Sequence, residues 1–95
     1  MRVINIAEQS GRYVSSRDAA RRIRESIVGP VCIDFTGVEV VSNSFAHELL
    51  GVLVGQHGEE WFASNVEVTG LSDCNREMVL RAISLELESR SGGVK

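Results

Sequence analysis

Several kinds of residue are scarce in this chain of 95 residues, and each shortage argues against a class of protein. The two cysteines, Cys32 and Cys74, lie far apart and outside any CxxC or Cys/His spacing. This arrangement argues against a disulfide framework and a structural zinc site. Residues 1–8 contain no uninterrupted apolar segment, and no run approaches the roughly 18 apolar residues of a membrane span. We therefore expect a cytoplasmic protein that does not enter a membrane.

Neither sign of charge is in large excess. The net charge of −3 argues against a general nucleic-acid binder, because such proteins carry strongly basic surfaces. Arg17, Arg21, Arg22 and Arg24 follow one another closely, but acidic residues are interspersed among them and no glycine-rich loop accompanies them. We interpret the arginines as the solvated face of a helix and expect another protein, not nucleic acid, as the partner.

The signatures of common enzymes are missing. No GxxxxGK[ST], GxGxxG, GxSxG or HExxH motif occurs. Ser44 and His47, with Glu48 or Asp34 as the acid, are the residue types of a Ser/His/acid catalytic triad. However, adjacent residues on a helix point in different directions, and no glycine-rich turn supplies an oxyanion hole. We expect no enzymatic activity, no cofactor and no metal ion.

The apolar pattern predicts one small α/β domain at residues 1–88, followed by a flexible tail at residues 89–95. Strands are expected at residues 3–6, 11–14, 31–35 with a continuation at 38–41, and 66–69; helices are expected at residues 15–28, 45–54 and from 72 onward. This order predicts a mostly parallel sheet of about four strands, joined by right-handed crossovers and covered by three helices.

Local signals refine these elements. Ser15 begins a capping-box pattern at the start of the first helix. Residues 31–35 are apolar on both faces apart from one acidic residue, which predicts a central strand covered on two sides. Residues 59–64 are expected to form a connection, in which Trp61 covers an edge of the core.

Three consecutive helix-capping residues, Ser42, Asn43 and Ser44, separate the strand-like segment from an apolar helix beginning at Phe45. One capping side chain satisfies a helix start, so three exceed the structural need. The helix dipole there favours negative charge, including a phosphate on serine. We expect a functional surface at this junction; the alternative, that the three are ordinary loop residues, stays open.

Asp34 lies near the carboxyl end of the predicted central strand. One interpretation is structural: its carboxylate accepts hydrogen bonds from the backbone of the turn that contains Thr36 and Gly37. The other is functional: it shapes the rim beside Ser42 and Ser44.

The predicted helix at residues 45–54 is apolar around more than half of its circumference. Such a helix packs between the sheet and another helix, leaves apolar surface for a partner, or does both. A second hypothesis is therefore a self-associating subunit, a homodimer formed through this helix or an open sheet edge. A third is a small-ligand-binding domain with its site near Asp34 and Ser42.

Residues 31–49, VCIDFTGVEVVSNSFAHEL, resemble the STAS-like domains, which are relatives of bacterial anti-sigma-factor antagonists. Within them, the segment is most similar to an uncharacterised subfamily with a Ser-Ser-Phe-Ala type signature. Residues 4–7 and 11–13 are also similar to that subfamily, so the resemblance extends over residues 3–85.

In the anti-sigma antagonists, the corresponding helix start carries a phosphorylatable serine in an Asp-Ser-Ser-Gly-like motif. A kinase with a histidine-kinase-like ATPase fold recognises it; the unphosphorylated form binds the ATPase and phosphorylation releases it. The resemblance places Ser42 at the acidic position, Asn43 at the phosphoacceptor, Ser44 at the following serine and Phe45 at the glycine. Because Asn43 does not accept phosphate, Ser44 or Ser42 would have to take its place.

The resemblance implies a non-enzymatic regulatory module that binds a histidine-kinase-like ATPase or an anti-sigma factor. The residues expected to bind the partner lie at the helix start and on the adjoining rim: Asp34, Ser42, Asn43, Ser44, His47 and Glu48. Ser44 and Ser42 are the candidate phosphorylation sites.

Overall fold

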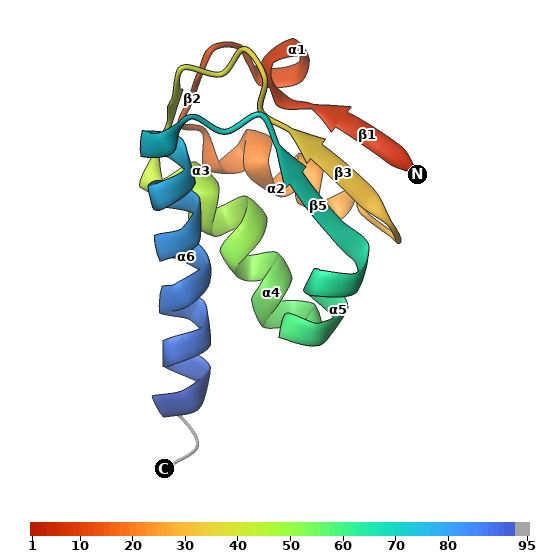
Figure 1. Ribbon diagram of the computed structural model, residues 1–95, viewed down its shortest axis with the longest axis vertical. Helices are drawn as coiled ribbons and strands as arrows, with labels where there is room; N and C mark the ends of the chain where they lie inside the picture. Colours follow the sequence, from red (N-terminus) through yellow and green to blue (C-terminus); the bar gives the residue numbers. More distant parts are fainter. Residues whose placement is uncertain (93–95) are drawn as a thin grey trace.

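A parallel sheet with helices packed on one of its faces forms the framework of the protein (Figure 1). The computed structural model describes the backbone of residues 1–92. Within that range, β1 (Arg2–Asn5), β3 (Val31–Asp34) and β5 (Val66–Thr69) lie in the order β1-β3-β5. All pairs are parallel, and the register aligns Ile33 with Ile4 on one side and with Val68 on the other. The predicted α/β class with a parallel sheet is confirmed.

The remaining two strands form a separate small sheet. β2 (Tyr13–Val14) pairs in parallel with β4 (Val40–Val41), so the expected sheet of about four strands is instead a sheet of three and a ribbon of two among the described residues. The turn after β3 causes the separation. Gly37 has a φ of 90°, and the backbone N–H of Val38 donates to the Phe35 carbonyl (2.9 Å), which directs the chain away from β3.

Five helices, not the three expected, occur within residues 1–92. They are α1 (Ile6–Ser10), α2 (Arg17–Glu25), the continuous helix made of α3 (Asn43–Ala46), the π-helical turn η1 (His47–Gly51) and α4 (Val52–His57), then α5 (Glu59–Asn65) and α6 (Asp73–Gly92). The short helices α1 and α5 are the additional ones. The prediction of a connection at residues 59–64 was wrong, because Trp61 and Phe62 of α5 pack against the core as a helical turn.

The bounds of several predicted helices shift slightly. The N-cap of α2 is Ser16, not Ser15: its hydroxyl accepts a hydrogen bond from the Ala19 N–H (3.1 Å). At the other end of the chain, the backbone of α6 continues to Gly92. Residues 93–95, the end of the expected tail, lie outside the described residues.

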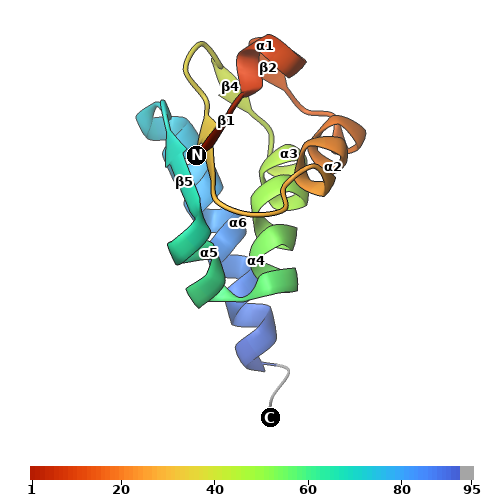
Figure 2. The ribbon, with the colours of Figure 1, turned by 90° about the vertical axis from the view of Figure 1, so that its right-hand side faces the viewer.

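The three-stranded sheet is covered on one face only. Ile4 and Ile33 point into the core and are almost fully buried, whereas their neighbours on the opposite face are not: Val3 is 63% exposed and Cys32 is half-buried. Figure 2 shows α2, α3 and α4 on the same side of the strands. The prediction of a central strand covered on both sides was therefore wrong, because α2, α3 and α4 lie on one side of the strands and the side chains on the opposite face are exposed or half-buried.

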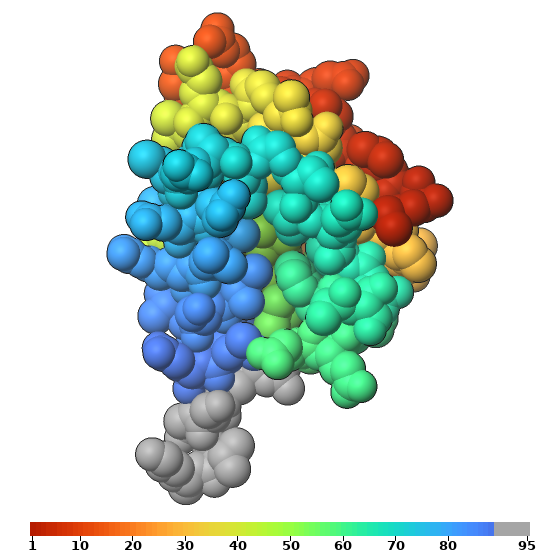
Figure 3. Space-filling model, in the orientation of Figure 1, coloured from red at the N-terminus to blue at the C-terminus, as the bar shows by residue number. Residues whose placement is uncertain are grey.

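The continuous helix α3-η1-α4, here called the central helix, is the most buried element. Phe45, Leu49, Leu50 and Leu53 are each at most 1% exposed. The π-helical turn contacts α2 and α6, and the space-filling view shows only a narrow green strip of the central helix between α6 and α5 (Figure 3). The prediction that this helix packs between the sheet and another helix is therefore confirmed. Among its described residues, no large apolar side chain is left exposed for a partner.

A buried ion pair joins the central helix to α2. Arg24 is 9% exposed, and its guanidinium donates to the Glu48 carboxylate (2.6 Å) and to the Glu48 carbonyl (2.9 Å). The interpretation of Arg24 as part of a solvated face was wrong. Arg24 lies one helical turn from Ala20, on the face of α2 that packs against η1, and Glu48 balances its charge.

No helix in the described range combines the length and the apolar content that crossing a bilayer requires.

Replacing Arg24 with alanine should lower the free energy of unfolding by about 2–4 kcal/mol, because it leaves the Glu48 carboxylate half-buried without its partner. Arg21→Ala is the matched control: it removes an exposed ion pair with Asp18 on the same helix and should cost less than about 0.5 kcal/mol. Urea unfolding measures both. Equal losses in the two variants would show that the Arg24 pair contributes no more than a surface pair.

Candidate functional site

The predicted helix start is fixed in place by the first residue of the polar triplet. Ser42 is the N-cap of α3: its hydroxyl accepts from the Phe45 N–H (3.1 Å), and its own N–H donates to the Val14 carbonyl of β2 (2.9 Å). The helix therefore begins at Asn43, two residues before the expected Phe45. One capping residue meets the structural need, as the sequence predicts, which leaves Asn43 and Ser44 for other roles.

A buried asparagine holds the strand that leads into this start. Asn75, in the first turn of α6, is 5% exposed and accepts from the Val41 N–H (3.2 Å). Its amide nitrogen donates to the carbonyls of Glu39 (3.2 Å) and Val38 (3.4 Å). Sequence reasoning missed Asn75, because an asparagine three residues after the cap Ser72 is also an ordinary helix-start residue and only its burial shows its function.

Asn43 and Ser44 are the side chains that the helix start presents. Asn43 is exposed and Ser44 is half-buried. No hydrogen bond among the described residues engages the amide of Asn43 or the hydroxyl of Ser44. Both groups are therefore available to a bound partner.

His47 and Glu48 point in different directions, although they are adjacent. Glu48 faces inward to Arg24, whereas His47 is 46% exposed and its Nε2 lies 3.9 Å from Glu86 Oε2 of α6. The imidazole lies over Gly51, whose lack of a side chain leaves room for it: an added Cβ would lie 3.0 Å from His47 Cδ2. The nominal Ser/His/acid set is not assembled in the described residues, since none of their hydrogen bonds joins Ser44, His47 and an acid.

Asp34 belongs to the turn after β3. Its Oδ1 accepts from the Thr36 N–H (2.9 Å) and hydroxyl (2.7 Å), and more distantly from the Thr69 hydroxyl (3.4 Å). These hydrogen bonds, those from Thr36 first, lower the pKa of the Asp34 carboxyl. The structural interpretation of Asp34 therefore has direct support, and no hydrogen bond of the described residues connects it with Ser42, Asn43 or Ser44.

The outer face of the β2–β4 ribbon extends the rim, which no pattern in the sequence predicts. Tyr13 and Val40 are opposite each other in register, 66% and 51% exposed. Beside them, Arg12 pairs with Glu39 (2.9 Å), and the Tyr13 hydroxyl donates to the same carboxylate. The Tyr13 hydroxyl and then Arg12 lower the pKa of Glu39, while the pKa of Tyr13 is raised. Val40 lies two residues before Ser42, so this apolar pair adjoins the helix start.

Of the six predicted partner-binding residues, the structure brings Ser42, Asn43, Ser44 and His47 together at the beginning of one helix. Glu48 is turned inward and Asp34 belongs to a separate turn. Within the described part of the chain, no group of three or more His, Cys, Asp or Glu side chains is placed to hold a metal ion.

A comparison with protein families finds one match. The model of a family described as "STAS-like domain of unknown function (DUF4325)" matches residues 19–75, which include α2, β3, the central helix and Asn75. Neither the curated proteins nor the solved structures gave a match.

The stability that Asp34 contributes should depend on pH. Because its folded pKa is lowered, this contribution is complete above the ordinary aspartate pKa of about 4 and is lost as the pH falls through the lowered value. The difference in unfolding free energy between the wild type and Asp34→Asn, measured by urea unfolding from pH 7 to pH 2, should therefore shrink below about pH 4. A difference that is constant with pH would contradict the assignment.

Proposed function

Because the chain belongs to the STAS-like domain family, we propose that it is a non-enzymatic regulatory module that binds a histidine-kinase-like ATPase or an anti-sigma factor through the start of α3. The observation that carries this proposal is the combination of a rigid helix start with unused polar groups. Ser42 and Asn75 hold the backbone, and Asn43 and Ser44 remain available. The proposal implies a cytoplasmic setting, since the partner would use ATP.

The apolar surface beside the helix start supports a protein partner over a small ligand. Tyr13 and Val40 are large exposed side chains on a short, fixed ribbon. An aromatic anchor beside polar groups is the composition typical of the centre of a protein interface, where a few residues supply most of the affinity. We include both residues in the proposed surface, with Asn43, Ser44 and His47.

Ser44 is the better candidate for a phosphorylation switch. A phosphate there would gain from the N-terminal end of the helix dipole. The nearby carboxylate of Glu48 would repel it, but Glu48 faces inward and its charge is balanced by Arg24. Ser42 is the weaker candidate, because its hydroxyl already caps the helix. A dianion at Ser44 would separate the two proteins if the partner packs closely over this turn.

Ser44→Arg should abolish partner binding without unfolding the domain, since the side chain is only half-buried and the expected dipole penalty is below about 1 kcal/mol. The measurement is a pull-down from native extract, followed by mass spectrometry of the captured proteins. Capture of a histidine-kinase-like ATPase or an anti-sigma factor by the wild type, and not by the variant, is the expected outcome.

Ser64→Arg provides the matched control, because it makes the same change at an exposed serine of α5, a helix that lies away from α3 (Figure 1). This variant should capture the same partner as the wild type. Thermal unfolding must show that all three proteins are folded. Loss of capture together with a large loss of stability in Ser44→Arg would make the triplet structural, and capture of no such partner by the folded wild type would remove the proposal's main support.

If Ser44 is the switch, incubation with the captured partner and ATP should add one phosphate mass to the wild type. Ser44→Ala should remain unmodified, whereas Ser42→Ala should still be modified. Intact-protein mass spectrometry distinguishes these outcomes. Absence of the added mass would reject the switch but not the binding.

A homodimer is the second candidate function, and one observation favours it. The central helix is buried, which leaves the edge strands β1 and β5 of the sheet as routes for self-association, with Val3 63% exposed on β1. Light scattering at high concentration separates the two proposals, because a monomer would eliminate the dimer.

A further inference from the structure

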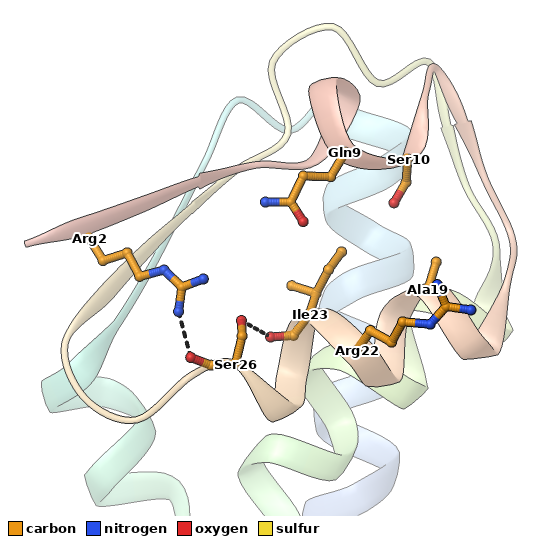
Figure 4. Close-up of a pocket in the computed structure, with 7 residues that line it drawn as sticks. All are labelled: Arg2, Gln9, Ser10, Ala19, Arg22, Ile23 and Ser26. Atoms are coloured by element: carbon orange, nitrogen blue, oxygen red, sulfur yellow. Dashed lines mark hydrogen bonds between the residues drawn. The ribbon is translucent and has the colours of Figure 1, made fainter.

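A polar cleft lies between β1, α1 and α2, on residues that the partner proposal does not use (Figure 4). Its volume is about 220 Å³. The lining residues come from all three elements: Arg2, Gln9, Ser10, Ala19, Arg22, Ile23 and Ser26. Figure 4 shows Arg2 and Arg22 on opposite sides of Ile23, with Gln9 above them. The cleft thus has an apolar floor between two cationic side chains.

The two arginines of the cleft differ from three others in the protein. Arg12, Arg21 and Arg24 each form an ion pair with a carboxylate. Arg2 and Arg22 form none within the described residues, and no acidic residue lines the cleft. In a chain with a net charge of −3, a cavity lined by two cations and no anion is a local reversal of the overall charge. Such a cavity attracts negatively charged ligands.

Several residues that line the cleft have unused hydrogen-bond donors. The side chains of Gln9 and Ser10 make no hydrogen bond with other described residues, and neither does Arg22. Arg2 is oriented by one hydrogen bond from its guanidinium to the Ser26 carbonyl, which leaves its other N–H groups available. This hydrogen bond reduces the entropy that binding would otherwise cost, since one of the two cations is already placed.

We propose that this cleft binds a small organic anion that carries phosphate or carboxylate groups. Arg2 and Arg22 would hold the anionic groups by charge-assisted hydrogen bonds, Gln9 and Ser10 would donate to further oxygens, and the carbon body would lie on Ile23. The size supports a small ligand: the volume is below the roughly 300 Å³ at which pockets for drug-sized molecules begin. A second hollow of about 170 Å³ shares Gln9, Ser10 and Ala19 and gives room for a slightly longer body.

The experiment is a titration of the ¹⁵N-labelled protein, followed by ¹H–¹⁵N NMR at constant ionic strength. Pyrophosphate and glycerol phosphate are the phosphate probes, and succinate is the dicarboxylate probe. At least one probe should give saturable shifts concentrated on Gln9, Ser10 and the Arg22 side chain; which one does so distinguishes phosphate from carboxylate recognition. Arg22→Gln should weaken that binding at least about tenfold, because it removes a charge-assisted contact.

Arg17→Gln is the matched control. It removes the same charge from the same helix, at an exposed position that does not line the cleft. It should leave the affinity within about twofold of the wild type, as expected for a screened charge. Gln9→Ala is a second test variant that keeps both cations and should also weaken binding.

Three results would overturn the proposal. The first is an absence of saturable shifts with every probe. The second is shifts spread over all the exposed arginines, weakened equally by Arg17→Gln and Arg22→Gln. The third is saturation by a polyglutamate peptide but by none of the small anions, which would assign the cleft to an acidic protein segment. None of these results depends on the ATPase or anti-sigma partner, so this proposal and the preceding one can fail separately.

Discussion

Burial of the central helix against one face of the sheet is the constraint on which the remaining structure depends. A helix that is apolar around most of its surface must be covered on every such side. The sheet covers one side, α2 covers another and α6 a third, which explains why the helices gather on one face of the strands. Glu48 is the charged residue that this arrangement brings into the contact with α2. Arg24 makes its burial possible, because an unpaired carboxylate there would cost several kcal/mol.

The same constraint determines what the helix start presents. The central helix exposes Asn43 and His47 near its start, directly after β4, and Gln56 and His57 at its end. Ser42 caps it, and Asn75 of α6 holds the three residues of backbone before it, Val38, Glu39 and Val41. The backbone is thus held from two sides, so a partner that binds Asn43 and Ser44 would order little of it on binding.

Most of the framework could be predicted from local sequence. The parallel α/β class, the strands at residues 31–34 and 66–69 and the three long helices follow from apolar periodicity and capping residues. Several of the predictions that failed share a physical cause. Arg24 and Asn75 bind residues 24 and 34 positions away, and periodicity carries no information about such contacts. Whether a strand is covered on one face or on both likewise depends on where distant helices pack. The sequence therefore did not show whether the apolar side chains of Val3 and Cys32 are buried. At the candidate site, the hydrogen bonds of Asp34 to its own turn are local, and they were one of the two roles that the sequence predicted for it. The inward orientation of Glu48 was not predicted, because it depends on the distant Arg24.

Some polar side chains of this domain form hydrogen bonds or ion pairs within the described part of the chain, and others form none. Ser42, Asn75, Asp34 and the Arg24–Glu48 pair all have partners within the chain. Some of the groups without such partners lie together: Asn43 and Ser44 share one helix turn, and Gln9, Ser10 and Arg22 share one cleft. The small hollow next to that cleft is lined by Phe45, the residue after Ser44, as well as by Gln9 and Ser10. A ligand that extended from the cleft into this hollow would therefore contact Phe45, which directly follows the residues that the helix start presents.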